Sequence, residues 1–238
     1  MTNPLQLVIT CEHAGNRVPA TYRALFSGAA QRLASHRGWD PGALPLARAL
    51  ARAFGVPCHA VPWTRLLVEA NRSPHHPAFW SDLTRSLPAA ERARIVSLYW
   101  KPHRLAVRAS VARALRAGRA VLHVSVHSFT PELDGAVRNA DIGLLYDPRL
   151  AFEVRTVRAW QAALAAVDPG LRVRRNYPYR GVADGHTTVL RRVFPDGYAG
   201  IELEVNQGLL YAEPARVRRA VVASVRAVMD AARKGERA

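Results

Sequence analysis

Two mostly apolar runs in the sequence end at histidines. Residues 5–10 lead directly to Glu12 and His13, and residues 121–126 lead to His127. Such a run, stopping at polar residues, is typical of a buried strand whose carboxyl end opens into a loop, which is where open α/β sheets build their sites. Although a lone histidine there is more often structural, two such imidazoles are what a mononuclear zinc site requires. His13 and His127 are therefore candidate metal ligands, with a structural role as the alternative for each.

A later strand offers two carboxylates on one face. Glu202 and Glu204 alternate with aliphatic residues over 201–205, so both side chains project from the same side of the strand. A carboxylate beside a metal can take a proton from water and pass it to a leaving amine. One of the two carboxylates could act in this way, and the alternative, a solvent-facing residue on an edge strand, suits Glu202 better than Glu204.

An amide and a guanidinium follow another aliphatic run. Asn71 and Arg72 come directly after residues 66–70. Because the planar fork of arginine matches a carboxylate, this pair is predicted to hold the acid group of a substrate.

Composition excludes several classes of protein. The 238 residues, 49% of them hydrophobic, suffice for one domain, 1–238, with a substantial core. The sequence has neither an 18-residue apolar run nor the features of a signal peptide, so we expect no membrane partner and a cytoplasmic location. Cys11 and Cys58 lack Cys-x-x-Cys spacing, which argues against a thiolate zinc cluster or a disulfide framework.

The net charge of +16 would ordinarily suggest a nucleic-acid partner. Only Lys101 and Lys234 are lysines, and the arginines are scattered through alanine-rich segments such as 89–116 instead of forming one tract. This scattered distribution of arginines favours a small anionic substrate steered by a basic cleft, and we expect no nucleic-acid partner.

Predicted strands and helices alternate along the chain. Strands are expected at residues 5–10, 56–61, 66–70, 121–127, 142–146, 171–175 and 201–206, and helices at 20–26, 42–54, 88–117, 149–166 and 214–234. Alternation of this kind predicts an α/β fold, a three-layer sandwich around a mostly parallel or mixed central sheet.

Six segments occur in the order found in a known family. From about Leu7 to Leu210 the chain resembles the N-formylglutamate amidohydrolases, in the segments Cys-Glu-His-Ala-Gly-Asn-Arg-Val-Pro at 11–19, Trp-Asp-Pro-Gly-Ala at 39–43, Glu-Ala-Asn-Arg at 69–72, His-Ser-Phe-Thr-Pro at 127–131, Asp-Ile-Gly-Leu-Leu at 141–145 and Glu-Val-Asn-Gln at 204–207. That family is similar in turn to the zinc carboxypeptidase and aspartoacylase group. The resemblance implies a zinc carboxypeptidase-like fold with one zinc ion per chain, held by His13 and His127. It also implies Asn71 and Arg72 as the carboxylate anchor and Glu204 as the base.

The sequence departs from this plan at one ligand. The carboxypeptidase plan places an acidic ligand three residues after the first histidine, where this chain has Asn16, a poor zinc ligand. Asp40 is the preferred replacement, although it could instead cap the helix that follows it. Glu12 is the alternative, but its position next to His13 predicts that it points to the other side of the strand end.

Other polar residues carry weaker predictions. Arg138 and Asn176 fall in segments resembling the family's loops, and with Arg180 they could bind the second carboxylate of a dicarboxylate substrate. His186 could donate a hydrogen bond to a developing oxyanion or stabilise its loop. Among the remaining histidines, His36 and His103 are expected on helix surfaces, and His59 and His123 in the core or behind the ligands.

These residues together predict zinc-dependent hydrolysis of an N-acyl amino acid such as N-formylglutamate, which releases formate and the amino acid. The alternative is a noncatalytic binder of acidic metabolites on the same fold, which Asn16 favours. A serine hydrolase is not expected because no Gly-x-Ser-x-Gly motif is present.

Overall fold

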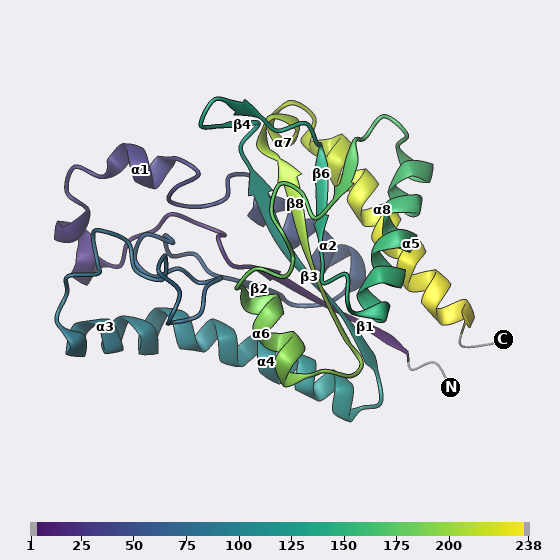
Figure 1. The fold of residues 1–238 in the computed structure, drawn as a ribbon, viewed down its shortest axis with the longest axis horizontal. Coiled ribbons are helices and arrows are strands. Elements are labelled where there is room, and N and C mark those ends of the chain that lie inside the picture. Colours follow the sequence, from purple (N-terminus) through teal and green to yellow (C-terminus); the bar gives the residue numbers. More distant parts are fainter. Residues whose placement is uncertain (1–3, 236–238) are drawn as a thin grey trace.

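A computed structural model describes residues 4–235 and contains a central six-stranded sheet (Figure 1). The strand order is β2-β1-β3-β8-β6-β7. These strands are β1 (Leu5–Cys11), β2 (Cys58–Ala60), β3 (Ala120–Phe129), β6 (Ile142–Leu145), β7 (Val173–Arg175) and β8 (Tyr198–Asn206). The first four strands in the order are parallel, and β6 runs antiparallel to β8. The predicted α/β fold with a mostly parallel sheet is confirmed.

Helices cover both faces of the sheet. On one face lie α2 (Ala43–Phe54), α5 (Ala151–Val167) and α8 (Pro214–Gly235), and on the other lie α4 (Lys101–Arg116) and α6 (His186–Val193) (Figure 1). Side chains of β1 alternate between the two layers: Ile9 joins the core under α2 and α8, whereas Val8 packs against α4 and α6. This period of two is what a strand buried on both faces requires.

Helix α2 begins without a side-chain cap. Its cap residue, Gly42, has a φ of 82°, and within residues 4–235 there is no side-chain hydrogen bond that caps the helix. The alternative assignment of Asp40 as the helix cap is therefore wrong, because the backbone turns at Gly42 and leaves the Asp40 carboxylate free to face the sheet.

The expected strand at residues 66–70 is wrong, because this segment forms turns. The amide of Leu67 bonds the carbonyl of Thr64, and the amide of Glu69 bonds the carbonyl of Phe79. The aliphatic side chains pack in a cluster apart from the sheet, with Tyr22, Phe26, Phe79 and Ile95 among its members. Packing within this cluster, rather than strand pairing, buries the apolar run.

The expected single helix at residues 88–117 is interrupted. It consists of α3 (Ala89–Ile95), a π-helical turn η2 (Val96–Trp100) and α4. Pro102, near the start of α4, has no N–H to continue the regular helical ladder, and this accounts for the irregular turn before it. The turn directs Trp100 and Arg104 to donate to the carbonyl of Arg72.

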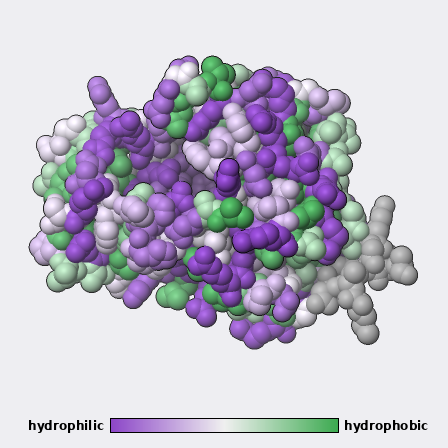
Figure 2. Space-filling model, in the orientation of Figure 1, coloured by the Kyte–Doolittle hydropathy of each residue, from purple (hydrophilic) through white to green (hydrophobic). Residues whose placement is uncertain are grey.

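The remaining elements are short. They are η1 (Ala20–Phe26, a 3₁₀ helix), α1 (Ala30–Ala34), α7 (Gln207–Ala212) and a hairpin of β4 (Glu132–Leu133) and β5 (Ala136–Val137). No helix within residues 4–235 has the length and apolarity to cross a membrane. The face seen in Figure 2 is largely hydrophilic, with hydrophobic residues in small separate patches.

Candidate metal centre and active site

The carboxyl ends of β1, β3 and β8 bring the predicted site residues together. In the register of β3 and β8, His127 lies opposite Glu204, so the two side chains are neighbours on one face. His13 follows β1 by two residues, and its carbonyl accepts a hydrogen bond of 3.0 Å from the amide of Asp40. This backbone contact holds the loop before α2 against the end of β1.

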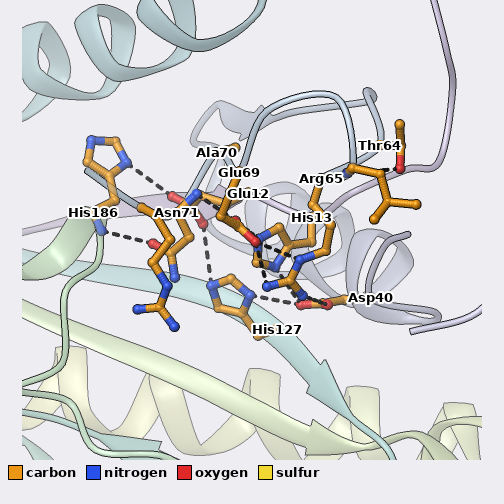
Figure 3. A network of polar contacts seen from close by, with 12 residues as sticks. Glu12, His13, Asp40, Thr64, Arg65, Glu69, Ala70, Asn71, His127 and His186 are labelled. Carbon is orange, nitrogen blue, oxygen red and sulfur yellow. Dashed lines mark hydrogen bonds and ion pairs between the residues drawn. The ribbon is translucent and has the colours of Figure 1, made fainter. Parts of the chain in front are cut away.

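His13, Asp40 and His127 converge on one point (Figure 3). Oδ2 of Asp40 lies 3.2 Å from Nδ1 of His13 and 2.8 Å from Nδ1 of His127. All three residues are buried, and each offers one ligand atom to a common centre.

The outer nitrogens of both imidazoles have other partners. Nε2 of His13 contacts a carboxylate oxygen of Glu69, and Nε2 of His127 lies 2.9 Å from Oγ of Ser125. When the outer nitrogen of a neutral ring carries the proton, Nδ1 is an acceptor. Two such lone pairs and a carboxylate oxygen facing one another repel unless a cation lies between them. The donor set of two imidazoles and one carboxylate therefore fits a zinc ion.

The electrostatics of this cluster favour positive charge. Burial lowers the pKa of His127, but the hydrogen bond and charge of Asp40, together with the charges of Glu204 and Glu12, outweigh burial and raise that pKa to about 10. Despite burial, the two histidines hold the pKa of Asp40 well below its usual range. A proton can therefore occupy in the metal-free protein the place that a metal cation would take.

Glu204 is buried beside this centre. Its Oε2 has no hydrogen-bond partner among the described residues, and burial raises its pKa to about 7. Glu202, on the same strand face, accepts a hydrogen bond of 2.8 Å from Thr187. The alternative of Glu202 as a solvent-facing edge residue is wrong, because β8 lies between β3 and β6 and Glu202 is buried.

These residues line a small cavity of about 150 Å³. Its walls also contain Asn71 and Arg72. Oδ1 of Asn71 accepts a hydrogen bond of 2.8 Å from the amide of His186, and the Arg72 guanidinium donates to the carbonyl of Asp184. The fork of Arg72 has further N–H groups for a carboxylate. The other lining residues are Arg65, Ser128, Tyr179, Arg180, Ala183 and Asp184.

Arg138 and Asn176 lie outside this lining. The guanidinium of Arg138 lies 5.1 Å from the ring centre of Tyr179, which does line the cavity. Oδ1 of Asn176 accepts hydrogen bonds of 3.0 Å from the amides of Tyr146 and Gly181. Asn176 thus holds the loop that carries Tyr179 and Arg180 to the cavity.

The structure adds two residues that the sequence analysis did not single out. Glu69 contacts His13, and Arg65 donates to Glu69 over 2.7 Å and lies 3.4 Å from Asp40. The sequence does show that Glu69 is an acid two residues before Asn71, near the end of an aliphatic run. Its contact with His13 was not predicted, because a strand was expected over residues 66–70.

Glu12 lies on the other side of the ligands from Asp40. Its Oε1 is 3.2 Å from both Nε2 of His103 and Nδ1 of His186. The expectation of a surface position for His103 is wrong, because only 7% of its side chain is exposed and it pairs with Glu12. Asn16 points away from the centre and donates to the carbonyl of Leu33.

Two other histidines make hydrogen bonds away from the centre, and only His123 lies in the core as expected, because His59 is half-buried. His123 is buried between Thr10 and Tyr198, at 2.9 and 2.7 Å. His59 lies 3.1 Å from Oγ of Ser110. Neither contributes a ligand atom to the candidate centre.

Comparisons with known proteins identify the chain's relatives. A family model described as N-formylglutamate amidohydrolase matches residues 5–211. The structure of the gene product Atu2144 from Agrobacterium tumefaciens is 30% identical, with a TM-score of 0.78 over 99% of this chain and 92% of that one. N-formylglutamate amidohydrolase from Ralstonia eutropha JMP134 has a similar fold at 19% identity, with a TM-score of 0.72 over 98% of this chain and 95% of that one. A search of curated proteins gave no match.

Proposed function

The chain belongs to the N-formylglutamate amidohydrolase family, and on this basis we propose that it hydrolyses the amide bond of N-acyl amino acids such as N-formylglutamate with the help of one zinc ion. The observation that carries the metal proposal is the convergence of the two Nδ1 atoms of His13 and His127 on one oxygen of Asp40. These three residues would hold the ion. When bound, zinc supplies a Lewis acid that polarises a carbonyl and acidifies water.

Glu204 is the proposed base. Its unpartnered Oε2 and its pKa of about 7 allow it to accept a proton near neutral pH. Glu204 would take a proton from the attacking water and deliver it to the nitrogen of the leaving amino acid as the C–N bond breaks. Water thus contributes a hydroxyl to the acyl product and a proton to the amine, which gives formate and a free amino acid from an N-formyl substrate.

Asn71 and Arg72 are the proposed anchor for the substrate α-carboxylate, since both line the cavity. For a dicarboxylate, Arg180 is the proposed contact for the second carboxylate. Arg138 and Asn176 would help to bind this second carboxylate indirectly, by holding the loop that carries Tyr179 and Arg180. Arg138 stacks on Tyr179, and Asn176 accepts a hydrogen bond from the amide of Gly181. The small cavity supports a metabolite-sized substrate rather than a peptide.

A substrate panel tests this proposal. Zinc-loaded protein is mixed with N-formyl and N-acetyl derivatives of glutamate, aspartate, leucine and lysine, and the released amine is measured. We expect N-formyl acidic amino acids to be cleaved with the highest kcat/KM. Binding of these compounds without release of amine would instead support the noncatalytic alternative.

A further inference from the structure

His127 is contacted on both ring nitrogens by buried groups. Nδ1 faces Asp40, and Nε2 lies 2.9 Å from Oγ of Ser125. Ser125 also contacts Glu12 (labelled in Figure 3), which is fully buried. The Oε2 atom of Glu12 is 2.6 Å from Oγ of Ser125. Oε2 of Glu12 is 3.6 Å from Nε2 of His127, beyond direct hydrogen-bonding distance.

We propose that Ser125 and Glu12 are positioning residues that fix the Nε2-protonated tautomer of His127, so that its Nδ1 lone pair faces the metal centre. The inference rests on the proposed function, because it assigns His127 as a ligand. Neither residue is required to touch the substrate.

The direction of the hydrogen bonds follows from counting protons. An ionised carboxylate only accepts, so the single proton of the Ser125 hydroxyl is donated to Glu12. Oγ of Ser125 can then only accept from Nε2 of His127, which must carry the ring proton. The opposite tautomer would leave two acceptors 2.9 Å apart with no proton between them.

Glu12 is itself held by a full set of donors. Thr10 lies 3.1 Å from Oε2, which Ser125 also contacts, while His103 and His186 approach Oε1. These donors come from β1, β3, α4 and α6, so the carboxylate cannot turn away from Ser125 without losing contacts to several elements. Outer hydrogen bonds of this kind orient metal-binding imidazoles and raise their basicity.

A second group of possible metal ligands consists of Glu12, His103 and His186. Hydrogen bonds explain the same geometry: the imidazoles of His103 and His186 donate to Oε1 of Glu12, and Oε2 accepts from Ser125. The proposal therefore assigns these contacts as hydrogen bonds, and it predicts one zinc ion per chain and not two.

Ser125 and Thr10 provide a matched pair of variants. Both side chains donate to Oε2 of Glu12, but only Ser125 contacts His127. Ser125→Ala should weaken zinc binding by roughly 10–100-fold in competition with a chromogenic chelator. Thr10→Val should bind zinc with an affinity close to that of the wild type. Glu12→Gln keeps the shape but makes the acceptor weaker, so it should also lose affinity.

The nitrogen-15 chemical shifts of the histidine rings in the zinc-loaded wild type report which ring nitrogen carries the proton and which binds the metal. They therefore test whether Ser125 and Glu12 set the tautomer of His127 or only stabilise the fold. We expect His127 to carry its proton on Nε2 and the metal on Nδ1. Equal zinc affinities for Ser125→Ala and Thr10→Val would overturn the inference while leaving the proposed function in place. Zinc bound through Nε2 of His127 would overturn the inference and also the proposed metal geometry at Nδ1, and a second zinc lost in His103→Ala would contradict the single zinc ion of both proposals. A wild type that binds no zinc would overturn both.

Discussion

At the scale of single residues, Glu204 has the environment with the clearest chemical consequence. Its carboxylate is buried beside His127, and one oxygen is unpartnered within the described residues. Glu202 has the same residue type and strand face, but Thr187 occupies one of its oxygens. The two carboxylates are about 6.6 Å apart along the strand, at the usual rise of roughly 3.3 Å per residue. Only one of them can therefore serve a given water molecule.

Replacing Glu204 with Gln should lower kcat by ~10²–10⁴-fold, because the amide cannot accept the water's proton. Zinc content should be unchanged, since the carboxylate is proposed to lie beside the metal. Steady-state kinetics and elemental analysis measure the two effects. Glu202→Gln is the control, and a near wild-type Glu204→Gln together with an inactive Glu202→Gln would move the base to position 202.

Asp40→Asn should lose most bound zinc, because the substitution removes the negative charge between His13 and His127. The metal-free variant should retain its far-UV circular dichroism, since α2 starts at Gly42 without a cap from Asp40. Asp184→Asn is the matched control. It removes an acid from the same cavity that pairs with Ser73 and not with a histidine. Full zinc occupancy in Asp40→Asn would exclude Asp40 as a ligand.

Arg72→Lys retains the positive charge but loses the planar fork. We expect a raised KM for carboxylate-bearing substrates with a smaller fall in kcat, because the anchor orients the substrate and does not move protons. Initial rates over a range of N-formylglutamate concentrations give both constants. An unchanged KM would contradict the assignment of Arg72 as the anchor.

Several residues of the candidate site could be predicted to lie near one another, because His13, His127 and Glu204 each lie within or just beyond a recognisable apolar run. The contact between Glu12 and His186 could not be predicted, because it joins residues 174 positions apart. For Asp40 the sequence allowed two roles, and only the conformation of Gly42 excluded the helix cap.

At the scale of elements, the site depends on three strands that are adjacent in space but distant in sequence. The sheet was predictable because apolar runs and helical segments alternate locally. Residues 66–70 were mispredicted because their aliphatic side chains pack with Phe79 and Ile95, contacts that no local pattern encodes. The irregular turn before α4 was equally hidden, although Pro102 marked the place where regular helix would fail.

A glycine of strand β6 lies against Glu204. Gly143 lies opposite Glu204 in the register, and a methyl group there would collide with the carbonyl of Tyr177 and approach Cβ of Glu204 to 3.3 Å. Gly143→Ala should lower stability by about 1–3 kcal/mol and also lower kcat, because β6 or Glu204 must shift.

Gly55→Ala is the comparison for this prediction. Gly55 has a φ of 63° and open space around it, so alanine there adds only backbone strain of about 1–2 kcal/mol. Thermal melts should show a lower melting temperature for both variants, and kinetic assays should show a lower kcat for Gly143→Ala alone. Equal kcat values would contradict a role for β6 in placing Glu204.

At the scale of the whole molecule, two packed regions meet at the site. The main core lies between the sheet and the helices α2, α5 and α8. A second cluster includes Tyr22, Leu67 and Phe79 and supports the turns that carry Glu69, Asn71 and Arg72. The part of the chain around η1, α1 and α3 extends to the left of the sheet in Figure 1. The site therefore needs both packed regions, and the second one was not visible in the sequence pattern.

The net charge of +16 also acts at this scale. Arg65, Arg72 and Arg180 line the cavity together with four acids, Asp40, Asp184, Glu202 and Glu204, so the excess positive charge is not concentrated in the cavity. The proposed recognition of an anionic substrate therefore rests on individual arginines and not on a basic cleft.

Zinc titration of the metal-free protein tests the central claim most directly. Aliquots of zinc are added to a known concentration of chains, and formate release from N-formylglutamate is measured after each addition. We predict a rate that rises linearly to one equivalent of zinc and then stays constant, while His127→Ala shows no rise at stoichiometric zinc. Full activity before any zinc is added, or no formate release from protein that has bound its zinc, would contradict the proposed function.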